Sequence, residues 1–331
     1  MKNKIFMLGF VLLLMLSVVA CGSSSNNTPA TEQKEPVEQP QAEEKVEEEV
    51  ATERTIEYLG EKYTVPAKVE RIVITGAMEA MEDSLVLDVH PVGAITFAGE
   101  FPEMFKSITV NAESIGEKIQ PNFETILKLK PDVILGTSKF QAEVVEQLQK
   151  IAPLIQVSHI AANWEANLQL LGELTDKQDL ADQKIAEYKA NLEDAKANLV
   201  EKLEGKKVLA VRVRRGSFNV YPEAVFVNPV LYTDLGLEAP EVVKAATAQQ
   251  AISVEQFAEV NPDYLFIQFS ESENTDNPNA LKELQENPII KNMKAFKDGN
   301  VFVNVIDPLC EGGPAWSRIQ FLDAVLENVG K

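Results

Sequence analysis

A repeated phrase constrains the fold of this chain more than any other feature of its sequence. The segment that begins at Asn122 reads NFETILKLKPDVILG, and the segment that begins at Ser253 reads SVEQFAEVNPDYLFI. Each opens on a residue typical of a helix start, continues with apolar residues at helical spacing, and passes through Pro-Asp into a strand-forming run. A phrase that recurs once is too sparse for a repeat array and predicts two lobes built alike.

Each predicted lobe also alternates strand and helix. An apolar strand opens each lobe, RIVITG from Arg71 and KKVLAVRVR from Lys206, and shorter strands follow at PLIQVSH from Pro153 and NVFVNVI from Asn300. Strands separated by helical patterns favour α/β lobes with mainly parallel sheets.

One long helix is predicted between the lobes. Apolar residues recur there every three or four positions, at Ala181, Ile185, Tyr188, Leu192, Ala195 and Leu199. We therefore expect an N-terminal lobe at 54–175, an interlobe helix at 176–204 and a C-terminal lobe at 205–331, with a cleft between the lobes.

Residues 1–20 have the pattern of a signal peptide. Two lysines precede an uncharged apolar run that ends just before Cys21. The run is shorter than the roughly 20 residues that a spanning helix needs, which leaves a membrane anchor as the weaker alternative. VVAC, ending at Cys21, resembles the lipobox of bacterial lipoproteins, which implies a lipid such as palmitate on Cys21. We expect a lipid-anchored protein on the extracellular face of a cell membrane of the Gram-positive type.

The next segment, residues 21–53, is rich in Glu, Pro and Gln and poor in large apolar residues, which predicts a disordered acidic tether. Lipidation of Cys21 leaves Cys310 as the one remaining cysteine, so no intrachain disulfide is expected. The formal net charge of -20 argues against nucleic acid as a partner.

The body from Arg54 to Lys331 resembles the iron-siderophore solute-binding lipoproteins of ATP-binding-cassette importers. The resemblance rests on the two Glu-to-Pro-Asp phrases and on VLAVRVRRGSFNVYPEAVFVNPVLYTDLGL from Val208. It implies the class III fold, in which two α/β lobes with mainly parallel sheets are joined by one long backbone helix. It also implies a monomeric receptor, not an enzyme, that has no intrinsic cofactor and delivers a ferric siderophore to a membrane permease.

Four cations are candidates for holding that ligand. Arg212 and Arg214 end a predicted strand and share one of its faces, because side chains alternate along a strand. Guanidinium groups suit carboxylate, hydroxamate and catecholate oxygens. Lys118 and Lys139 lie in predicted loops at strand ends, and the resemblance implies that two such lysines and an Arg-x-Arg pair clasp the ferric complex. The alternative for each cation is an ordinary ion pair or a solvated surface position.

Two aromatic residues and two glutamates complete the candidate set. The resemblance implies that Tyr221 hydrogen-bonds the ligand, because hydroxamate receptors similar to this chain place a tyrosine near that position. Trp316 is expected to form an apolar wall, although it suits packing against a lobe equally well. Glu124 and Glu255 occupy matching positions in the two phrases. An acid there is favoured by the helix dipole, and the resemblance implies that the pair docks on permease arginines.

The ligand class rests on the same resemblance. The region from Arg212 to Leu237 looks most like hydroxamate receptors, so a hydroxamate or hydroxamate-citrate siderophore is the first expectation and a catecholate the second. Some catecholate receptors carry a further cation where this chain has Thr247, with Lys244 as the nearest substitute, and this departure weakens the catecholate expectation.

Three other functions stay as weaker alternatives. A haem receptor could use Tyr221 as an axial ligand. An exported hydrolase lacks support because the sequence contains no recognisable catalytic motif. A receptor for bare metal ions is disfavoured because His90 and His159 are the only histidines, and no protein metal site is expected.

Overall fold

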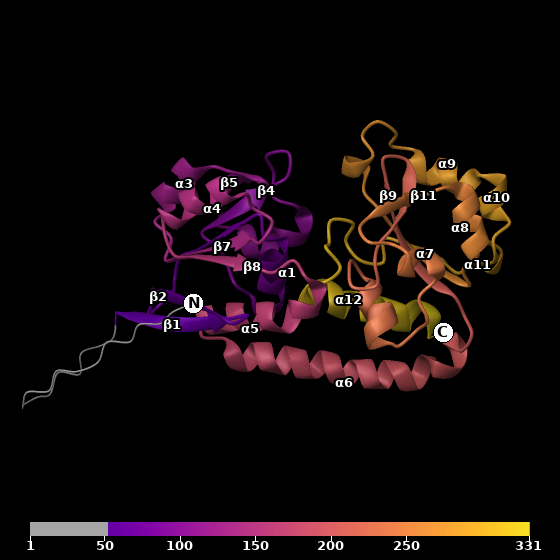
Figure 1. Ribbon diagram of the computed structural model, residues 1–331, viewed down its shortest axis with the longest axis horizontal. Coiled ribbons are helices and arrows are strands. Elements are labelled where there is room, and N and C mark those ends of the chain that lie inside the picture. The colour runs from indigo at the N-terminus through magenta and orange to yellow at the C-terminus, as the bar shows by residue number, and fades with distance from the viewer. Residues whose placement is uncertain (1–51, 331) are drawn as a thin grey trace, which may run out of the picture. The chain divides into compact units, whose positions relative to one another are not determined.

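The computed structural model describes residues 52–330, drawn in colour in Figure 1. The predicted signal peptide, the lipidation of Cys21 and nearly all of the tether lie outside the described residues. Within the described part of the chain, no helix is both long enough and apolar enough to cross a membrane.

The first lobe is built on a six-stranded sheet with the strand order β6-β5-β4-β3-β7-β8. Neighbouring strands are parallel except for the β5–β6 hairpin. The strands are β3 (Ile72–Thr75), β4 (Gly93–Thr96), β5 (Glu113–Glu117), β6 (Gln120–Pro121), β7 (Val133–Thr137) and β8 (Leu154–Val157). The helices are α1 (Met78–Leu87), α2 (Lys106–Thr109), α3 (Phe123–Leu129), α4 (Ala142–Gln149) and α5 (Trp164–Leu174).

An antiparallel hairpin, β1 (Glu53–Tyr58) and β2 (Glu61–Pro66), precedes this sheet. The sequence patterns did not predict it, and β1 begins at the last residue assigned to the tether. Leu59 and Gly60 both have positive φ, as a tight two-residue hairpin turn requires. The Tyr58 hydroxyl donates to Asn167 Oδ1 of α5 (2.5 Å), which ties the hairpin to the lobe.

The long helix is α6 (Gln178–Leu203), which lies within the 176–204 segment and runs below both lobes in Figure 1. The six residues that define its predicted apolar stripe are all buried. They face α5 of the first lobe and the C-terminal helix α12 (Ala315–Val329).

The second lobe has a five-stranded sheet with the order β11-β10-β9-β12-β13. The β9–β12 and β12–β13 pairs are parallel, whereas β10 and β11 are antiparallel to their neighbours. The strands are β9 (Val208–Arg214), β10 (Ser217–Val220), β11 (Gln250–Ile252), β12 (Tyr264–Phe269) and β13 (Val301–Val303). Its other helices are the π-helix η3 (Pro229–Asp234), α7 (Glu241–Lys244), α8 (Val254–Val260), the 3-10 helix η4 (Glu271–Glu273), α9 (Ala280–Glu286), α10 (Pro288–Lys291) and α11 (Lys294–Asp298).

The structure explains the Pro-Asp in each repeated phrase. In the first lobe, Asp132 Oδ2 accepts the backbone N–H of Arg71 (2.8 Å), just before β3. In the second, Asp263 Oδ2 accepts the backbone N–H of Lys207 (2.9 Å), just before β9. Each aspartate therefore fixes the start of the strand that pairs in parallel with its own.

The last helix contacts both lobes. α12 follows the second lobe in sequence, but it packs against α1, α5 and α6. Its Arg318 is 2% exposed, donates to the Ala161 carbonyl, pairs with Asp234, and lies 5.1 Å from the ring centre of Trp164. A buried, fully paired guanidinium thus joins segments from both lobes.

Candidate functional site

The candidate cations lie at the carboxyl ends of strands, where open α/β sheets bind their ligands. Lys118 follows β5 and Lys139 follows β7 in the first lobe, whereas Arg212 and Arg214 belong to the last residues of β9 in the second. The backbone arrangement expected for these four residues is therefore present.

The two arginines share one carboxylate. Glu273, at the end of η4, accepts from Arg212 Nε (2.7 Å) and Arg212 Nη2 (2.9 Å) and pairs with Arg214 Nη2 (2.8 Å). Arg212 also donates to the Pro308 carbonyl (3.1 Å), and only 9% of its surface is exposed. A two-pronged contact of this kind is among the strongest that a carboxylate makes in a protein.

Gln249 links Tyr221 to this arginine pair by hydrogen bonds. The Gln249 Oε1 atom accepts from Arg214 Nη1 (2.6 Å) and from the Tyr221 hydroxyl (3.1 Å). Tyr221 is buried and packs on the ring of Phe226, and this burial raises the pKa of its hydroxyl.

Lys118 crosses to the second lobe. Its ammonium group pairs with Glu311, which lies in the segment between β13 and α12. The backbone N–H of Glu311 donates to Glu82 Oε1 of α1 (2.7 Å). We call this region, made of α1, the β5–β6 turn, the residue 304–314 segment and the end of β9, the interlobe junction.

Lys139 is exposed and lies near the same carboxylate. Burial acts to raise the pKa of Glu311, but Lys118, Lys139 and Arg212 lower it by more, so that carboxyl stays ionised. Cations from both lobes therefore act on one glutamate.

Three acids on α1 border the junction. Burial raises the pKa of Glu79 to about 7 and that of Glu82 to about 8, and it raises the pKa of Asp83 well above its usual value. Glu82 also accepts from the Ser317 hydroxyl, and Asp83 Oδ1 accepts the Ala315 N–H (3.2 Å). These carboxyls hold the start of α12 against the first lobe.

The remaining candidates are placed as follows. Trp316 is half-buried and packs against the hydrophobic core from α12. Glu124 and Glu255 are exposed in the first turns of α3 and α8. The ligand-binding roles assigned to the cations and aromatic residues, and the docking roles of the two glutamates, stay predictions.

Cys310 has no features of a nucleophile. It is fully buried, and burial raises the pKa of its thiol far above the usual value. Because the thiolate is the reactive form, this cysteine offers no support for the hydrolase alternative.

Each of the two histidines lies within hydrogen-bond distance of a polar side chain. His90 lies 2.9 Å from Asp88, and His159 Nδ1 lies 2.8 Å from the Ser138 hydroxyl. Across residues 52–330, no group of three or more His, Cys, Asp or Glu side chains is arranged to hold a metal ion.

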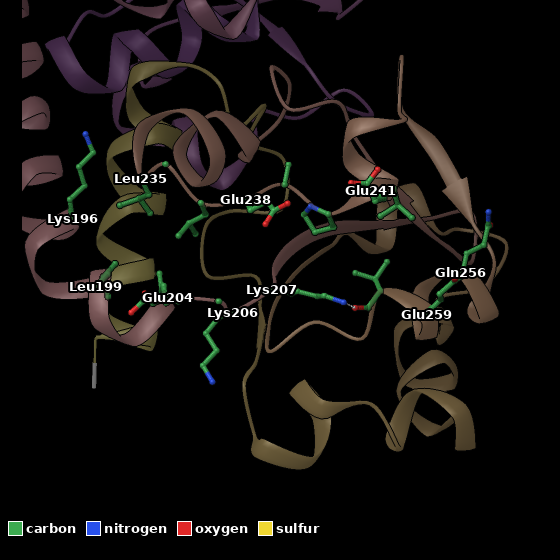
Figure 2. Close-up of a pocket in the computed structure, with 18 residues that line it drawn as sticks. Lys196, Leu199, Glu204, Lys206, Lys207, Leu235, Glu238, Glu241, Gln256 and Glu259 are labelled. Carbon is green, nitrogen blue, oxygen red and sulfur yellow. Dashed lines mark hydrogen bonds between the residues drawn. The ribbon is translucent and has the colours of Figure 1, made fainter.

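A separate cavity of about 960 Å³ lies in the second lobe (Figure 2). Its lining comes from the end of α6, the 235–242 segment and α8, and includes Leu199, Leu235, Lys207, Glu238 and Glu259. None of the candidate ligand residues lines it. It borders Lys206 and Lys207, at the amino end of β9 and thus opposite the strand ends where α/β sheets bind ligands.

The contacts also show what the sequence patterns missed. Glu273 and Glu311 were not singled out, because each is distant in sequence from the cation it meets. Glu79, Glu82 and Asp83 did leave a signal, since their spacing puts three acids on one face of a helix whose other residues are apolar except for Ser84.

Comparison with known proteins identifies the family. Residues 92–304 match the family model described as "Periplasmic binding protein", and the chain belongs to that family. The membership expected from the sequence is thus confirmed, as is the class of fold, and a family of binding proteins supports the expectation that the chain is not an enzyme.

Individual relatives show which members of the family this chain is similar to. The chain is 44% identical over 327 residues to the iron-uptake system-binding protein of Bacillus subtilis (strain 168), covering 99% of both chains. A solved structure described as the triscatecholate siderophore binding protein FeuA from Bacillus subtilis, complexed with ferri-bacillibactin, is similar with a TM-score of 0.79 and 48% identity. That match covers 83% of this chain and 98% of the other. The Fe(3+)-citrate-binding protein YfmC of Bacillus subtilis (strain 168) is 29% identical, with coverage of 91% of this chain and 89% of its own length.

Proposed function

We propose that this chain is a ferric-siderophore receptor, that its ligand is of the tris-catecholate type, and that it delivers this ligand to the permease of an ATP-binding-cassette importer. One observation carries the proposal: cations from both lobes meet at the carboxyl ends of the strands, around Glu273 and Glu311. Donors in that arrangement suit a compact ligand with several anionic oxygens.

The catecholate class replaces the hydroxamate class, which was the first expectation from the family resemblance. The relative described with a triscatecholate ligand is 48% identical to this chain, whereas the Fe(3+)-citrate-binding relative is 29% identical. A ferric ion held by three catecholate dianions is a trianion, which matches a site rich in cations.

Iron recognition then needs no ligand from the protein. The siderophore supplies the oxygen atoms that hold the iron, and the receptor recognises the outer charge and shape of the complex.

Delivery to the permease is the second half of the proposal. Glu124 and Glu255 stand exposed on equivalent helices of the two lobes, which suits docking on paired arginines. A lipid on Cys21 would keep a monomeric receptor near its permease and raise the local concentration of both glutamates at the docking surface.

The test is a binding panel on the purified full-length chain, read by quenching of its two tryptophans. Ferric tris-catecholate should bind at least about tenfold more tightly than ferric trihydroxamate, ferric citrate or iron-free catecholate. Arg212→Ala should weaken binding, and Arg215→Ala, an exposed residue beyond the same strand, should not. Equal affinity across the panel, or no effect of Arg212→Ala, would refute the proposal.

A further inference from the structure

Of the four candidate cations, Lys118, Arg212 and Arg214 are paired with acids of the protein itself. Glu273 holds both arginines of β9 with contacts of 2.7 to 2.9 Å, and its side chain is 15% exposed. Any anionic ligand that uses the donors of Arg212 must compete with this carboxylate for them.

Glu311 does the same for the first lobe, and it does so across the interlobe junction. It pairs with Lys118, and about a third of each side chain is exposed, at 34% for the lysine and 28% for the glutamate. A ligand that binds Lys118 has to displace a carboxylate that belongs to the other lobe.

The geometry allows both side chains to leave without disturbing the sheets. Glu273 ends the short helix η4, and Glu311 lies in an irregular segment, so neither belongs to a strand. The backbone near Glu311 is fixed, because its N–H donates to Glu82 and Gln268 donates to the nearby Asp307 and Cys310 carbonyls. Only the side chains need to turn towards water.

We propose that Glu273 and Glu311 stand in for the ligand's anionic oxygens in the empty receptor, and that they set a charge threshold that a ligand must exceed to bind. This inference rests on the proposed function and adds a rule for its selectivity. A trianionic ferric complex contacts cations of both lobes at once and compensates for both broken pairs. A small, weakly charged anion reaches one cation and leaves the pairs intact.

A different role for the same residues makes the opposite prediction. If Glu273 served to hold Arg212 in its binding geometry, removing its charge would weaken every ligand. If it competes with the ligand, removing its charge strengthens every ligand that uses Arg212, because displacement no longer costs an ion pair.

The experiment compares the full-length wild-type chain with Glu273→Gln and Glu311→Gln, which keep side-chain size and remove the charge. Glu193→Gln is the matched control, since Glu193 pairs with Lys196 on the exposed face of α6. Ferric tris-catecholate and ferric citrate are titrated at fixed ionic strength, and circular dichroism checks that each variant is folded.

Each of the two variants should bind both ferric complexes more tightly than wild type, with a gain of about tenfold for ferric citrate and a smaller gain for ferric tris-catecholate, and the control should not change. The affinity of Glu273→Asp, which keeps the charge on a shorter side chain, should fall between those of wild type and Glu273→Gln. Unchanged or weaker binding by both glutamine variants, with wild type still binding tris-catecholate, overturns the inference and leaves the proposed function standing. No binding by any of the chains overturns both.

Discussion

The two lobes share one construction but present their cations differently. In both, a short helix, Pro-Asp and a parallel strand repeat the same phrase, and the aspartate fixes the neighbouring strand. The second lobe then supplies arginines from the strand itself, with Arg212 9% exposed and clamped. The first lobe supplies lysines from loops, with Lys139 exposed. A common scaffold therefore carries a buried, paired arginine at the strand end of one lobe and an exposed lysine at the strand end of the other.

The largest expected effect on stability comes from removing Arg318, whose contacts join the two lobes. Arg318→Met should lower the free energy of unfolding by about 3 to 5 kcal/mol, because Asp234 would be left without its cation at a buried site. Urea unfolding followed by circular dichroism measures it.

Arg215→Met is the control for Arg318→Met, since Arg215 is exposed in the β9–β10 turn. It should change the free energy of unfolding by no more than about 0.5 kcal/mol. Similar losses in the two variants would mean that Arg318 does not join the lobes energetically.

The second-largest expected difference lies between the buried, paired Arg212 and the exposed Lys139 in their effect on ligand affinity. Arg212→Ala should weaken binding of ferric tris-catecholate about a hundredfold, because the ligand loses a buried donor and meets the unpaired charge of Glu273. Lys139→Ala should weaken it about threefold, since an exposed ammonium contributes little. Fluorescence titration compares the two, and equal losses would contradict the division between the lobes.

The junction also makes stability depend on pH. Glu79 and Glu82 have pKa values of about 7 and about 8 in the folded chain, against about 4.5 when exposed. Between these values the folded state binds more protons than the unfolded state, so stability falls as pH rises from about 4.5 to about 8. We expect a loss on the order of 1 to 3 kcal/mol, measured by urea unfolding at several pH values.

Glu82→Gln provides the control for this pH dependence. The variant cannot ionise at that position, so its stability should vary less with pH over the same window. A wild-type chain whose stability rises with pH there would show that these carboxyls are ionised in the folded state.

The smallest expected difference concerns docking on the permease, where the glutamates of the two lobes should contribute unequally to uptake. Glu124 pairs with Lys128 (2.7 Å), one turn along α3, whereas the equivalent position on α8 is Glu259. Glu255→Gln should therefore reduce uptake of ferric siderophore by cells about threefold, and Glu124→Gln by less than about twofold, with ligand affinity unchanged in both. In a Lys128→Gln chain, Glu124 loses its partner, and Glu124→Gln should then reduce uptake by more than it does in the wild-type chain. Equal reductions of uptake by Glu124→Gln and Glu255→Gln, with or without Lys128, would refute the asymmetry.

The sequence predicted the features that depend on local pattern. The strand starts, the apolar stripe of α6 and the strand-end positions of Lys118, Lys139, Arg212 and Arg214 all follow from periodicity and alternation. These signals lie within a few residues of one another, so a single chain is enough to read them.

Contacts between distant segments could not be predicted in the same way. Nothing near Arg212 in the sequence indicates that Glu273 will reach it, and nothing near Lys118 indicates Glu311. α12 likewise meets the first lobe through a hydrogen bond between Arg318 and the Ala161 carbonyl, two residues that are 157 positions apart in the sequence.

The buried thiol of Cys310 has a practical consequence for observing this receptor at work. The sequence contains one other cysteine, Cys21. A maleimide dye reacts with thiolates, and the raised pKa and burial of Cys310 protect it from such a reagent. In a Cys21→Ser chain, a cysteine introduced at Ile119 and another at Val303, both exposed, would be the reactive positions within residues 52–330. Energy transfer between dyes on these two residues, one from each lobe, would then report lobe movement during a single binding event.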